Sequence, residues 1–548
     1  MIKGLTSHKV RQSAPKPPVK KCSPPRSKST VFGNASLAGQ RGRKAAPKEQ
    51  IPLVAESIAG LDKQGFPHIP NEVWNALFSV VRSAVLALLK LVEAFSRDSR
   101  NDPLELIQET IPQWVAQTGI AVMEATLVGQ TGHQGNRLVC DECGERALRF
   151  KGYAPHSFKV PLGVVSHRRA YYHCDCCHHS AYPMDNVLGL DGKHRMVPHL
   201  QETMALMSAR MSYPEALDII SKLLPVQHCL KLQEDVTHAI AAVARAEQER
   251  EHQEAFLKPA KAKFPKGKPP GEEASEIAAV AADGGYCPMK GKDEPAREFK
   301  LGVLGWLHPK PRATPDEEPP EVKGRHYTAT FRGCDFAMEL TELEFHRMGL
   351  DKAKIIQVVG DGAEWIWNRA PNFKVNDEQE LVLTLDLYHA RERISDVANA
   401  YFGQESPYGR EWYKERDAEL LDGRLPAFFA AFTRLATDAS ARGDKELAVE
   451  ILENRTYFHK RQPMLDYKGF LERGLLVGSG MVEGGIRFVG KDRLSRTGMK
   501  WSEPGAEDIL ALRALHASGR WEDFVATRTH QRRQRAAALK SRWQGRAA

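Results

Sequence analysis

The sequence predicts a multidomain protein with a layered α/β domain in its C-terminal half, and three observations support this prediction. The chain has 548 residues, and single hydrophobic cores seldom grow beyond about 250 to 300 residues. Hydrophobic strands alternate with helical patterns over residues 275–395, which is typical of a layered α/β domain. Two Cys-x-x-Cys pairs occur in the N-terminal half among short alternating stretches that predict strands. We therefore expect several units in series.

Composition and apolar periodicity divide the chain into these units. Apolar positions at helical spacing predict two helical units before the α/β domain, and the second is compatible with a helix-turn-helix. Within it, Ser212, Pro214 and Glu215 predict a helix that starts with a capping box. In chain order we expect a disordered basic Pro-rich tail (1–50), a helical domain (51–135), a zinc ribbon (136–190), a helical DNA-binding unit (191–256), a linker (257–274), the first part of the α/β core (275–395), a helical insertion (396–470), the remainder of the core (471–520) and a basic C-terminal tail (521–548).

The net charge of +9 is distributed unevenly. Residues 1–50 contain 12 Lys or Arg against Glu49 alone, and residues 528–548 add seven more cations. Both ends therefore predict solvated basic tails that could hold phosphates, with solubilising tails as the alternative. The N-terminus lacks the apolar core of a signal peptide, and no run of about 18 apolar residues is evident, so we expect a cytoplasmic protein without a membrane span.

Four of the nine cysteines pair by spacing, as Cys140-x-x-Cys143 and Cys174-x-x-Cys177. Two such knuckles in a cytosolic protein predict one structural Zn²⁺, because thiolates at this spacing can close a tetrahedral site. The fourth ligand stays open, since Cys176, His178 and His179 crowd the second knuckle. Unrelated buried or redox-active cysteines are the alternative.

Three carboxylates are candidates for a second kind of metal site. Asp283 and Asp361 each follow a hydrophobic strand and precede glycine, and Glu483 stands in the first turn of a predicted helix. Strand ends of an open α/β sheet are where ligands gather, and hard oxygen ligands suit Mg²⁺ or Mn²⁺. Two such ions could support phosphodiester chemistry. A lone Asp-Gly is more often a turn, so the prediction depends on the order strand, strand, helix.

Further polar residues accompany these acids. Asp386 and His389 close the last predicted strand, either contacting phosphate or forming a structural hydrogen-bonded pair. The stretch after Glu483 is strongly basic, which predicts contacts with DNA phosphates. Its cations are Arg487, Lys491, Arg493, Arg496 and Lys500.

Several of these segments resemble known motifs. They are the double Cys-x-x-Cys followed by YPMDNVLGL, then SARMSYPEALDII, VVGDGAEWIWN, LDLYHARE and GLLVGSGMVEGGIRFVGKDRLSRTGMKW. In this order they resemble the DDE transposases of bacterial insertion sequences, most closely the ISKra family and more distantly the ISLre and Mutator-like groups. The resemblance implies a retroviral-integrase-like (RNase H-like) domain with an all-helical insertion, and Asp283, Asp361 and Glu483 as its acidic triad. The segment after Asp283 departs from the family pattern.

The expected function is that of a transposase of a mobile element, acting on double-stranded DNA as a homo-oligomer near the bacterial nucleoid. Two catalytic Mg²⁺ or Mn²⁺ ions would support DNA cleavage and strand transfer during transposition and recombination. Two alternatives stay open, namely an inactive or domesticated DNA-binding relative and a structure-selective nuclease on the same fold.

Overall fold

The computed structural model of the chain describes residues 68–97, 104, 106–190, 193–257, 262–267, 271, 273–291 and 294–543. All of them belong to one compact unit, Gly60–Ala548. The predicted tail over residues 1–50 lies outside the described residues, as do parts of the predicted linker. Within this range the protein is a multidomain α/β structure with a mixed sheet, an antiparallel sheet and many helices.

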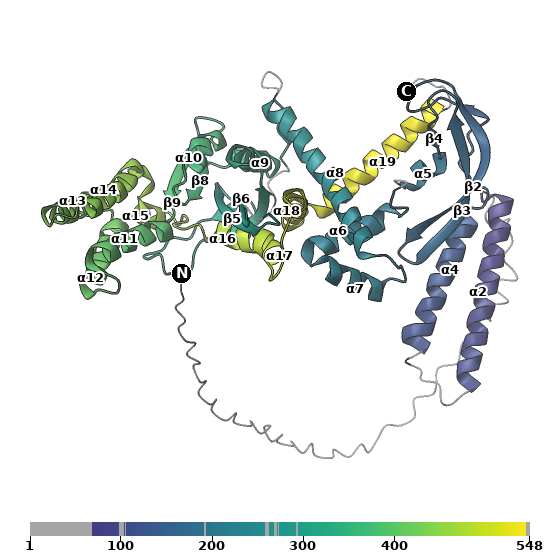
Figure 1. The fold of residues 1–548 in the computed structure, drawn as a ribbon, viewed down its shortest axis with the longest axis horizontal. Helices are drawn as coiled ribbons and strands as arrows, with labels where there is room; N and C mark the ends of the chain where they lie inside the picture. The colour runs from purple at the N-terminus through teal and green to yellow at the C-terminus, as the bar shows by residue number, and fades with distance from the viewer. Residues whose placement is uncertain are drawn as a thin grey trace, which may run out of the picture. The chain divides into compact units, whose positions relative to one another are not determined.

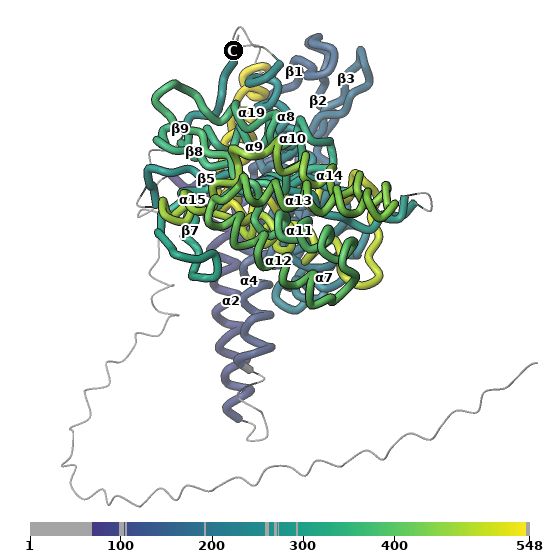
Figure 2. Tube along the Cα trace, turned by 90° about the vertical axis from the view of Figure 1, so that its left-hand side faces the viewer, coloured from purple at the N-terminus to yellow at the C-terminus, as the bar shows by residue number. Residues whose placement is uncertain are grey.

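Two long helices come first, α2 (Asn71–Arg97) and α4 (Ile111–Thr126), with a short π-helix η2 (Leu106–Thr110) before α4. They lie side by side (Figures 1 and 2), and the Trp114 indole donates to the carbonyl of Ala84 over 3.0 Å. By length and composition α2 is apolar enough to cross a membrane, and it is the single such helix among the described residues. No membrane span was expected from the sequence, because no apolar run reaches about 18 residues, but α2 meets the criterion of length and composition although Arg82 and Lys90 lie within it. Length and composition alone do not assign α2 to a membrane.

The cysteine-bearing segment forms an antiparallel sheet in the order β1-β2-β3-β4. Its strands are β1 (Arg137–Leu138), β2 (Leu148–Val160), β3 (Gly163–Cys174) and β4 (Ser180–Ala181). The central hairpin is longer than the short strands that the sequence suggested, because alternation continues through both strands: one face is buried and the other is exposed. The short helix α5 (Pro183–Leu188) follows.

Three helices come next, α6 (Pro198–Arg210), α7 (Tyr213–Leu223) and α8 (Leu230–Phe256). The predicted capping box is confirmed at α7, where the Ser212 hydroxyl accepts from the Glu215 amide and the Glu215 carboxylate accepts from the Ser212 amide. Met204, Ile220 and Ile240 form the core of this unit.

A mixed five-stranded sheet with the order β7-β6-β5-β8-β9 forms the centre of the C-terminal half. Its strands are β5 (Ile277–Pro288), β6 (Ala296–His308), β7 (Glu321–Thr330), β8 (Ile355–Gly360) and β9 (Glu380–Leu385). The first three are antiparallel neighbours, while β8 runs parallel to both β5 and β9. Parallel pairing brings the C-terminal ends of β8 and β9 to one edge of the sheet, next to the middle of β5, which continues along β6 to Pro288.

Helices cover both faces of this sheet (Figure 1), because β5 is apolar on both sides. Ala278 and Val280 pack toward the first face, and Ala279 and Ala281 toward the second. The first face carries α9 (Cys334–Arg347), η4 (Leu350–Lys352), α10 (Glu364–Arg369) and η5 (Ala370–Phe373). The second carries α11 (Leu387–Phe402), α16 (Gly480–Gly485), the π-helix η7 (Ile486–Lys491), α17 (Asp492–Leu494) and α18 (Glu503–Ala517).

The predicted helical insertion is a helical block that begins directly at the end of β9 with α11, nine residues before the expected boundary at 396. Phe428, Phe432 and Phe458 form its aromatic centre, which is continuous with the core under the sheet. The block continues with α12 (Pro407–Leu421), α13 (Leu425–Ala441), α14 (Lys445–Lys460), η6 (Gln462–Met464) and α15 (Tyr467–Glu472).

The C-terminal segment differs from the solvated basic tail that the sequence suggested. Residues Trp521–Trp543 form the helix α19, whose buried aromatic residues anchor both of its ends. Trp521 and Phe524 pack into the core of α6 and α8, and Trp543 packs into the core of the cysteine-bearing sheet. Arg528 and Arg532 both contact the buried carboxylate of Glu202. These arginines are therefore ion-paired within the fold.

Candidate functional site

Asp283 and Asp361 lie on neighbouring strands, at the point where the parallel pairing of β5 with β8 ends. The prediction that Asp283 ends its strand is wrong, because β5 continues to Pro288 in antiparallel pairing with β6, whereas Asp361 directly follows β8. Ala281 of β5 pairs with Val359 of β8, so the parallel register brings Asp283 beside Asp361 two positions later. Burial raises the pKa of Asp283, and the charge of Asp361 raises it further, against the opposing effects of His389 and Lys300. A carboxylate held this way is stabilised by a nearby cation.

Backbone amides orient both aspartate side chains. The Gly284 amide donates to Asp283 over 2.6 Å, and the Ala363 amide donates to Asp361 over 2.9 Å. Each aspartate uses Oδ1 in this contact. Each Oδ2 therefore stays available for a ligand.

The helical block holds the loop that carries Asp361. The Tyr457 hydroxyl donates to the Asp361 carbonyl over 2.8 Å, and Arg461 donates to the Gly362 carbonyl over 2.6 Å. Gly362 has a φ of +95°, and a Cβ there would lie 2.0 Å from the Tyr457 hydroxyl. The glycine that follows Asp361 is thus required by this docking of α14.

Asp386 has a different environment from Asp283 and Asp361. It is fully buried and caps α11, accepting from the Tyr388 amide over 2.6 Å. It also accepts from the Ser479 amide over 2.7 Å and from the Ser479 hydroxyl. Burial favours the neutral acid, but donors on His389 and Ser479 outweigh it and lower the pKa of Asp386. Asp386 therefore links the end of β9 to the start of α16.

His389 lies on the first turn of α11 beside these carboxylates. Its Nδ1 is 3.6 Å from Oδ2 of Asp386, and the Asp386 carboxylate raises the pKa of His389 to about 9, with a smaller contribution from Asp361. The imidazole is half-buried and is a cation at neutral pH. It supplies positive charge next to the acids, and the predicted pairing of Asp386 with His389 is present as an ion pair.

Glu483 lies on α16, which packs tightly across β5 and β6. A Cβ on Gly485 of α16 would lie 2.8 Å from Val303, and one on Gly490 of the following helix η7 would lie 2.2 Å from the Phe299 ring. Glu483 itself is exposed. Across the described part of the chain, the groups of three or more ligand atoms within 4.8 Å of one another lie elsewhere. The structure therefore brings Asp283 and Asp361 together and anchors the helix of Glu483 nearby, without closing all three acids into one cluster.

The five cations predicted to contact DNA differ in their surroundings. Arg487, Lys491 and Lys500 are exposed, and Arg496 is exposed with an ion pair to Glu215 over 2.9 Å. Arg493 is 1% exposed and donates to the Ser208 carbonyl over 2.9 Å. The prediction for Arg493 is therefore wrong, because this side chain reaches back into the helical unit and does not face solvent.

Other cations near this surface were not found from the sequence. A hollow between α6, η7 and α18 is lined by Arg210, Lys491, Arg496 and Arg513. Arg513 donates to the carbonyls of Val489 and Ala209 over 2.6 and 2.8 Å, and burial lowers its pKa to about 10, so it stays charged. Arg210 and Arg513 lie on two helices far apart in sequence, so no local pattern connects them.

Lys300 is a further missed residue. Lys300 lies on β6 and pairs with Gly284 of β5, the residue after Asp283. Its ammonium group lies 4.9 Å from the centre of the Trp365 ring. It also forms a 2.7 Å ion pair with Glu298. Its position depends on strand pairing, which the sequence around it does not reveal.

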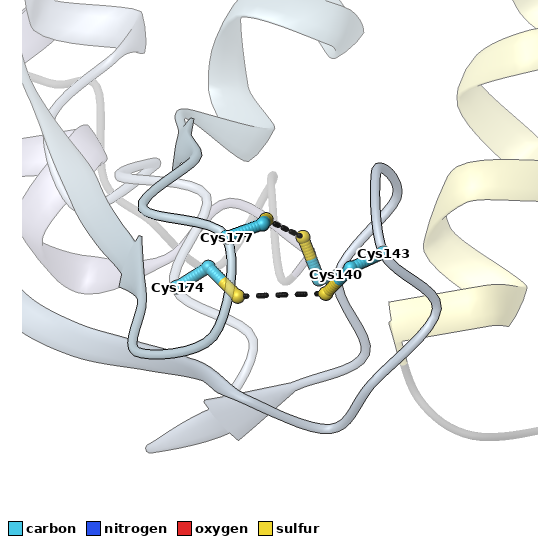
Figure 3. A group of neighbouring side chains, drawn as sticks. All are labelled: Cys140, Cys143, Cys174 and Cys177. Atoms are coloured by element: carbon cyan, nitrogen blue, oxygen red, sulfur yellow. Dashed lines mark hydrogen bonds between the residues drawn. The ribbon is translucent and has the colours of Figure 1, made fainter.

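The four paired cysteines converge at one end of the β2–β3 hairpin (Figure 3). The Sγ atoms of Cys140 and Cys177 are 3.6 Å apart, and those of Cys143 and Cys174 are 3.7 Å apart. A tetrahedral zinc with Zn–S bonds of about 2.3 Å requires sulfurs about 3.8 Å apart. The residues present thus fit a structural zinc, with Cys177 as the fourth ligand rather than Cys176 or a nearby histidine.

Backbone donors favour the thiolate at Cys174, whereas the pKa of Cys140, Cys143 and Cys177 is raised, with burial contributing at each. The amide of Cys177, followed by that of Cys176, lowers the pKa of Cys174 to about 7. With four protein sulfurs around the ion, no position is left for substrate, so a zinc here shapes the fold.

Comparison with known proteins adds no family assignment. No protein-family model matches the chain, and no curated protein sequence matches it.

Proposed function

We propose that this chain is a DNA transposase that binds the ends of an insertion sequence and catalyses metal-dependent phosphodiester hydrolysis and strand transfer. The observation that carries the proposal is the position of Asp283, within β5, beside Asp361, at the end of the adjacent parallel strand β8, with the Glu483 helix tied to the end of β9 through Asp386. An RNase H-like fold for residues 275–520, interrupted by the helical block, agrees with the mixed sheet covered by helices on both faces.

The acids supply the ligands for two Mg²⁺ or Mn²⁺ ions. When bound, such ions activate a water or a 3′-hydroxyl and stabilise the leaving oxygen. Asp283 and Asp361 offer their second carboxylate oxygens at the sheet edge, and Glu483 is exposed on an anchored helix. We propose that Glu483, which is exposed, completes this ligand set when the ions are bound.

The basic surface supplies contacts with the DNA backbone. Arg487, Lys491, Arg496 and Lys500 are exposed beyond Glu483, and Arg210 and Arg513 line the adjacent hollow. Charge of this density attracts phosphate regardless of base sequence. Recognition of element ends is assigned to the zinc ribbon and the α6–α8 unit, and a homo-oligomer acting on DNA in the bacterial cytoplasm completes the proposal.

The decisive test compares Glu483→Gln with the parent protein in Mg²⁺ on a plasmid that carries the element and its flanking DNA. Cleavage at the element ends should be lost, with end binding in a gel-shift assay unchanged. Glu472→Gln is the matched control, because Glu472 is an exposed acid on α15, and it should cleave normally. Parental cleavage by the Glu483 variant would refute the assignment.

The same assay separates the proposal from its alternatives. Asp283→Asn and Asp361→Asn should behave as Glu483→Gln does. An inactive DNA-binding relative would bind ends without metal-dependent cleavage, and a structure-selective nuclease would cut branched DNA equally well with or without element ends. Competition between element ends and random DNA at one fixed salt concentration distinguishes these outcomes.

A further inference from the structure

A second group of metal-ligating side chains lies on the β2–β3 hairpin, away from the four cysteines. His156 on β2 and His167 on β3 are direct cross-strand partners, and Asp185 comes from α5. One ligand atom from each lies within 4.8 Å of the other two. The three residues are 6%, 8% and 8% exposed, so each is more than nine-tenths buried.

The polar atoms of this group lack partners. Nδ1 of His156, both ring nitrogens of His167 and Oδ1 of Asp185 are buried without a hydrogen bond among the described residues. Leaving a buried polar group unsatisfied costs about 1–3 kcal/mol, so four such atoms in one place are not expected without a bound species. The neighbouring Phe158 and Val165 are apolar and offer no hydrogen bonds.

We propose that His156, His167 and Asp185 bind one divalent transition-metal ion, of which Zn²⁺ is the representative. Two imidazole nitrogens, which are borderline ligands, together with one carboxylate oxygen make a donor set that binds first-row ions such as zinc. The pair of histidines faces one side of the hairpin because strand residues two apart share a face and directly opposed residues point the same way. The fourth position is left for a water.

The surrounding charges fit this assignment and also limit the affinity. Arg169 forms an ion pair with Oδ2 of Asp185 and stacks 3.8 Å above the Tyr182 ring, which leaves Oδ1 of Asp185 for the ion. Arg169 and Arg195 both place positive charge near His156. Their repulsion makes this site weaker than the four-cysteine site, so a chelator removes its ion first.

The proposed site is distinct from the cysteine cluster and has a different role. His167 and Cys174 are seven residues apart on β3, which corresponds to roughly 23 Å along a strand. An ion at His156, His167 and Asp185 would fasten α5 to the hairpin. Since α19 packs against α5, the ion also supports the docking of the C-terminal helix.

Cobalt titration of the full-length metal-free chain in excess Mg²⁺, which keeps the carboxylate ligands of the proposed catalytic site occupied, tests the proposal without a variant. Cobalt bound by four thiolates has an intense charge-transfer absorption, whereas cobalt bound by nitrogen and oxygen has only weaker d–d bands. We expect one equivalent with the charge-transfer band and a second, weaker equivalent without it. Binding that stops at one equivalent would overturn the proposal and would indicate that water satisfies the buried atoms.

Zinc content by mass spectrometry of zinc-saturated, dialysed protein provides the matched comparison. The parent should hold two zinc ions per chain and His167→Ala one, with the thiolate-to-cobalt band of His167→Ala unchanged as evidence that the hairpin still folds. His199→Ala is the control, because His199 is exposed on α6, and it should keep two. Two zinc ions in a folded His167→Ala protein would refute the site.

Discussion

Replacement of Asp386 by asparagine tests whether this residue anchors the helix of Glu483. Oδ1 of Asp386 accepts from the amides of Tyr388 and His389, while Oδ2 accepts from the amide and the hydroxyl of Ser479. Asparagine keeps one acceptor oxygen and replaces the other with an NH₂ group. That group would face either the amides of Tyr388 and His389 or the amide and hydroxyl of Ser479, all of which are donors to Asp386 in the parent protein. The variant therefore loses both bonds of one oxygen in a fully buried place.

The size of the effect follows from those two bonds. A hydrogen bond to a charged group contributes about 1.5–3 kcal/mol, so the loss of two in Asp386→Asn should lower the free energy of unfolding by about 3–6 kcal/mol. For a domain of 150–250 residues, 1 kcal/mol shifts the melting temperature by about 2–4 °C, which gives a fall of about 10 °C. Cleavage at element ends should fall as well, because the first turn of α16 is no longer fixed.

Urea denaturation and the plasmid cleavage assay measure the two effects. Asp396→Asn is the control, since Asp396 is exposed on the same helix α11, and its free energy of unfolding should stay within about 0.5 kcal/mol of the parent value. A double-mutant cycle with Ser479→Ala should give a coupling of about 1 kcal/mol or more. If Asp386→Asn matched the parent in stability and cleavage, the anchoring argument would be refuted.

Two further predictions concern buried and exposed charges. Burial alone would raise the pKa of Glu344, but Arg520, Arg347 and His326 lower it to about 2. The pKa of Glu344 in the folded protein is thus below the usual value of 4.5. The contribution of this carboxylate to the free energy of unfolding is therefore complete above about pH 4.5 and is lost as the pH falls toward 2. Glu344→Gln should lower the free energy of unfolding by about 3–5 kcal/mol at pH 7. Because the variant lacks the carboxylate, its stability measured by denaturation should fall less between pH 4.5 and pH 2 than that of the parent, and an equal fall would contradict this prediction. Lys491→Ala should reduce the salt dependence of DNA binding by about one unit of slope with stability unchanged, and an unaltered slope would remove Lys491 from the interface.

The sequence predicted those features that depend on local patterns. The strands that carry Asp283 and lead to Asp361 could be found because each contains a short apolar run followed by an aspartate and a glycine. The continuation of β5 from Asp283 to Pro288 could not, because it depends on pairing with β6. The capping box at Ser212 could be found because it depends on residues three positions apart. The cysteine knuckles likewise rest on spacing, although the choice of Cys177 over Cys176 required the positions of the sulfurs.

Features that depend on distant partners could not be predicted in this way. Arg493 stands in a run of cations, yet its guanidinium lies 4.8 Å from the Trp501 ring and hydrogen-bonds to a carbonyl of α6. The segment from Trp521 is as basic as a solvated tail, but the buried tryptophans at its two ends, Trp521 and Trp543, hold it against the rest of the fold. In both cases a few long-range contacts outweigh the average polarity of the segment.

The pairing of His156 with His167 lies between these two cases. The hairpin turns at Pro161 and Leu162, and Val160 opposite Gly163 fixes a register in which the residue numbers of every pair from the turn back to Gly152 add to the same value, before a bulge shifts the pairing by one residue. From that turn alone, His156 must oppose His167. Asp185 cannot be obtained by the same reasoning, because α5 reaches the hairpin through tertiary packing and not through pairing. A rule based on the spacing of metal ligands therefore finds the four cysteines, because each pair is local in sequence. The same rule misses the site of His156, His167 and Asp185, because strand register brings the two histidines together and the packing of α5 adds the aspartate.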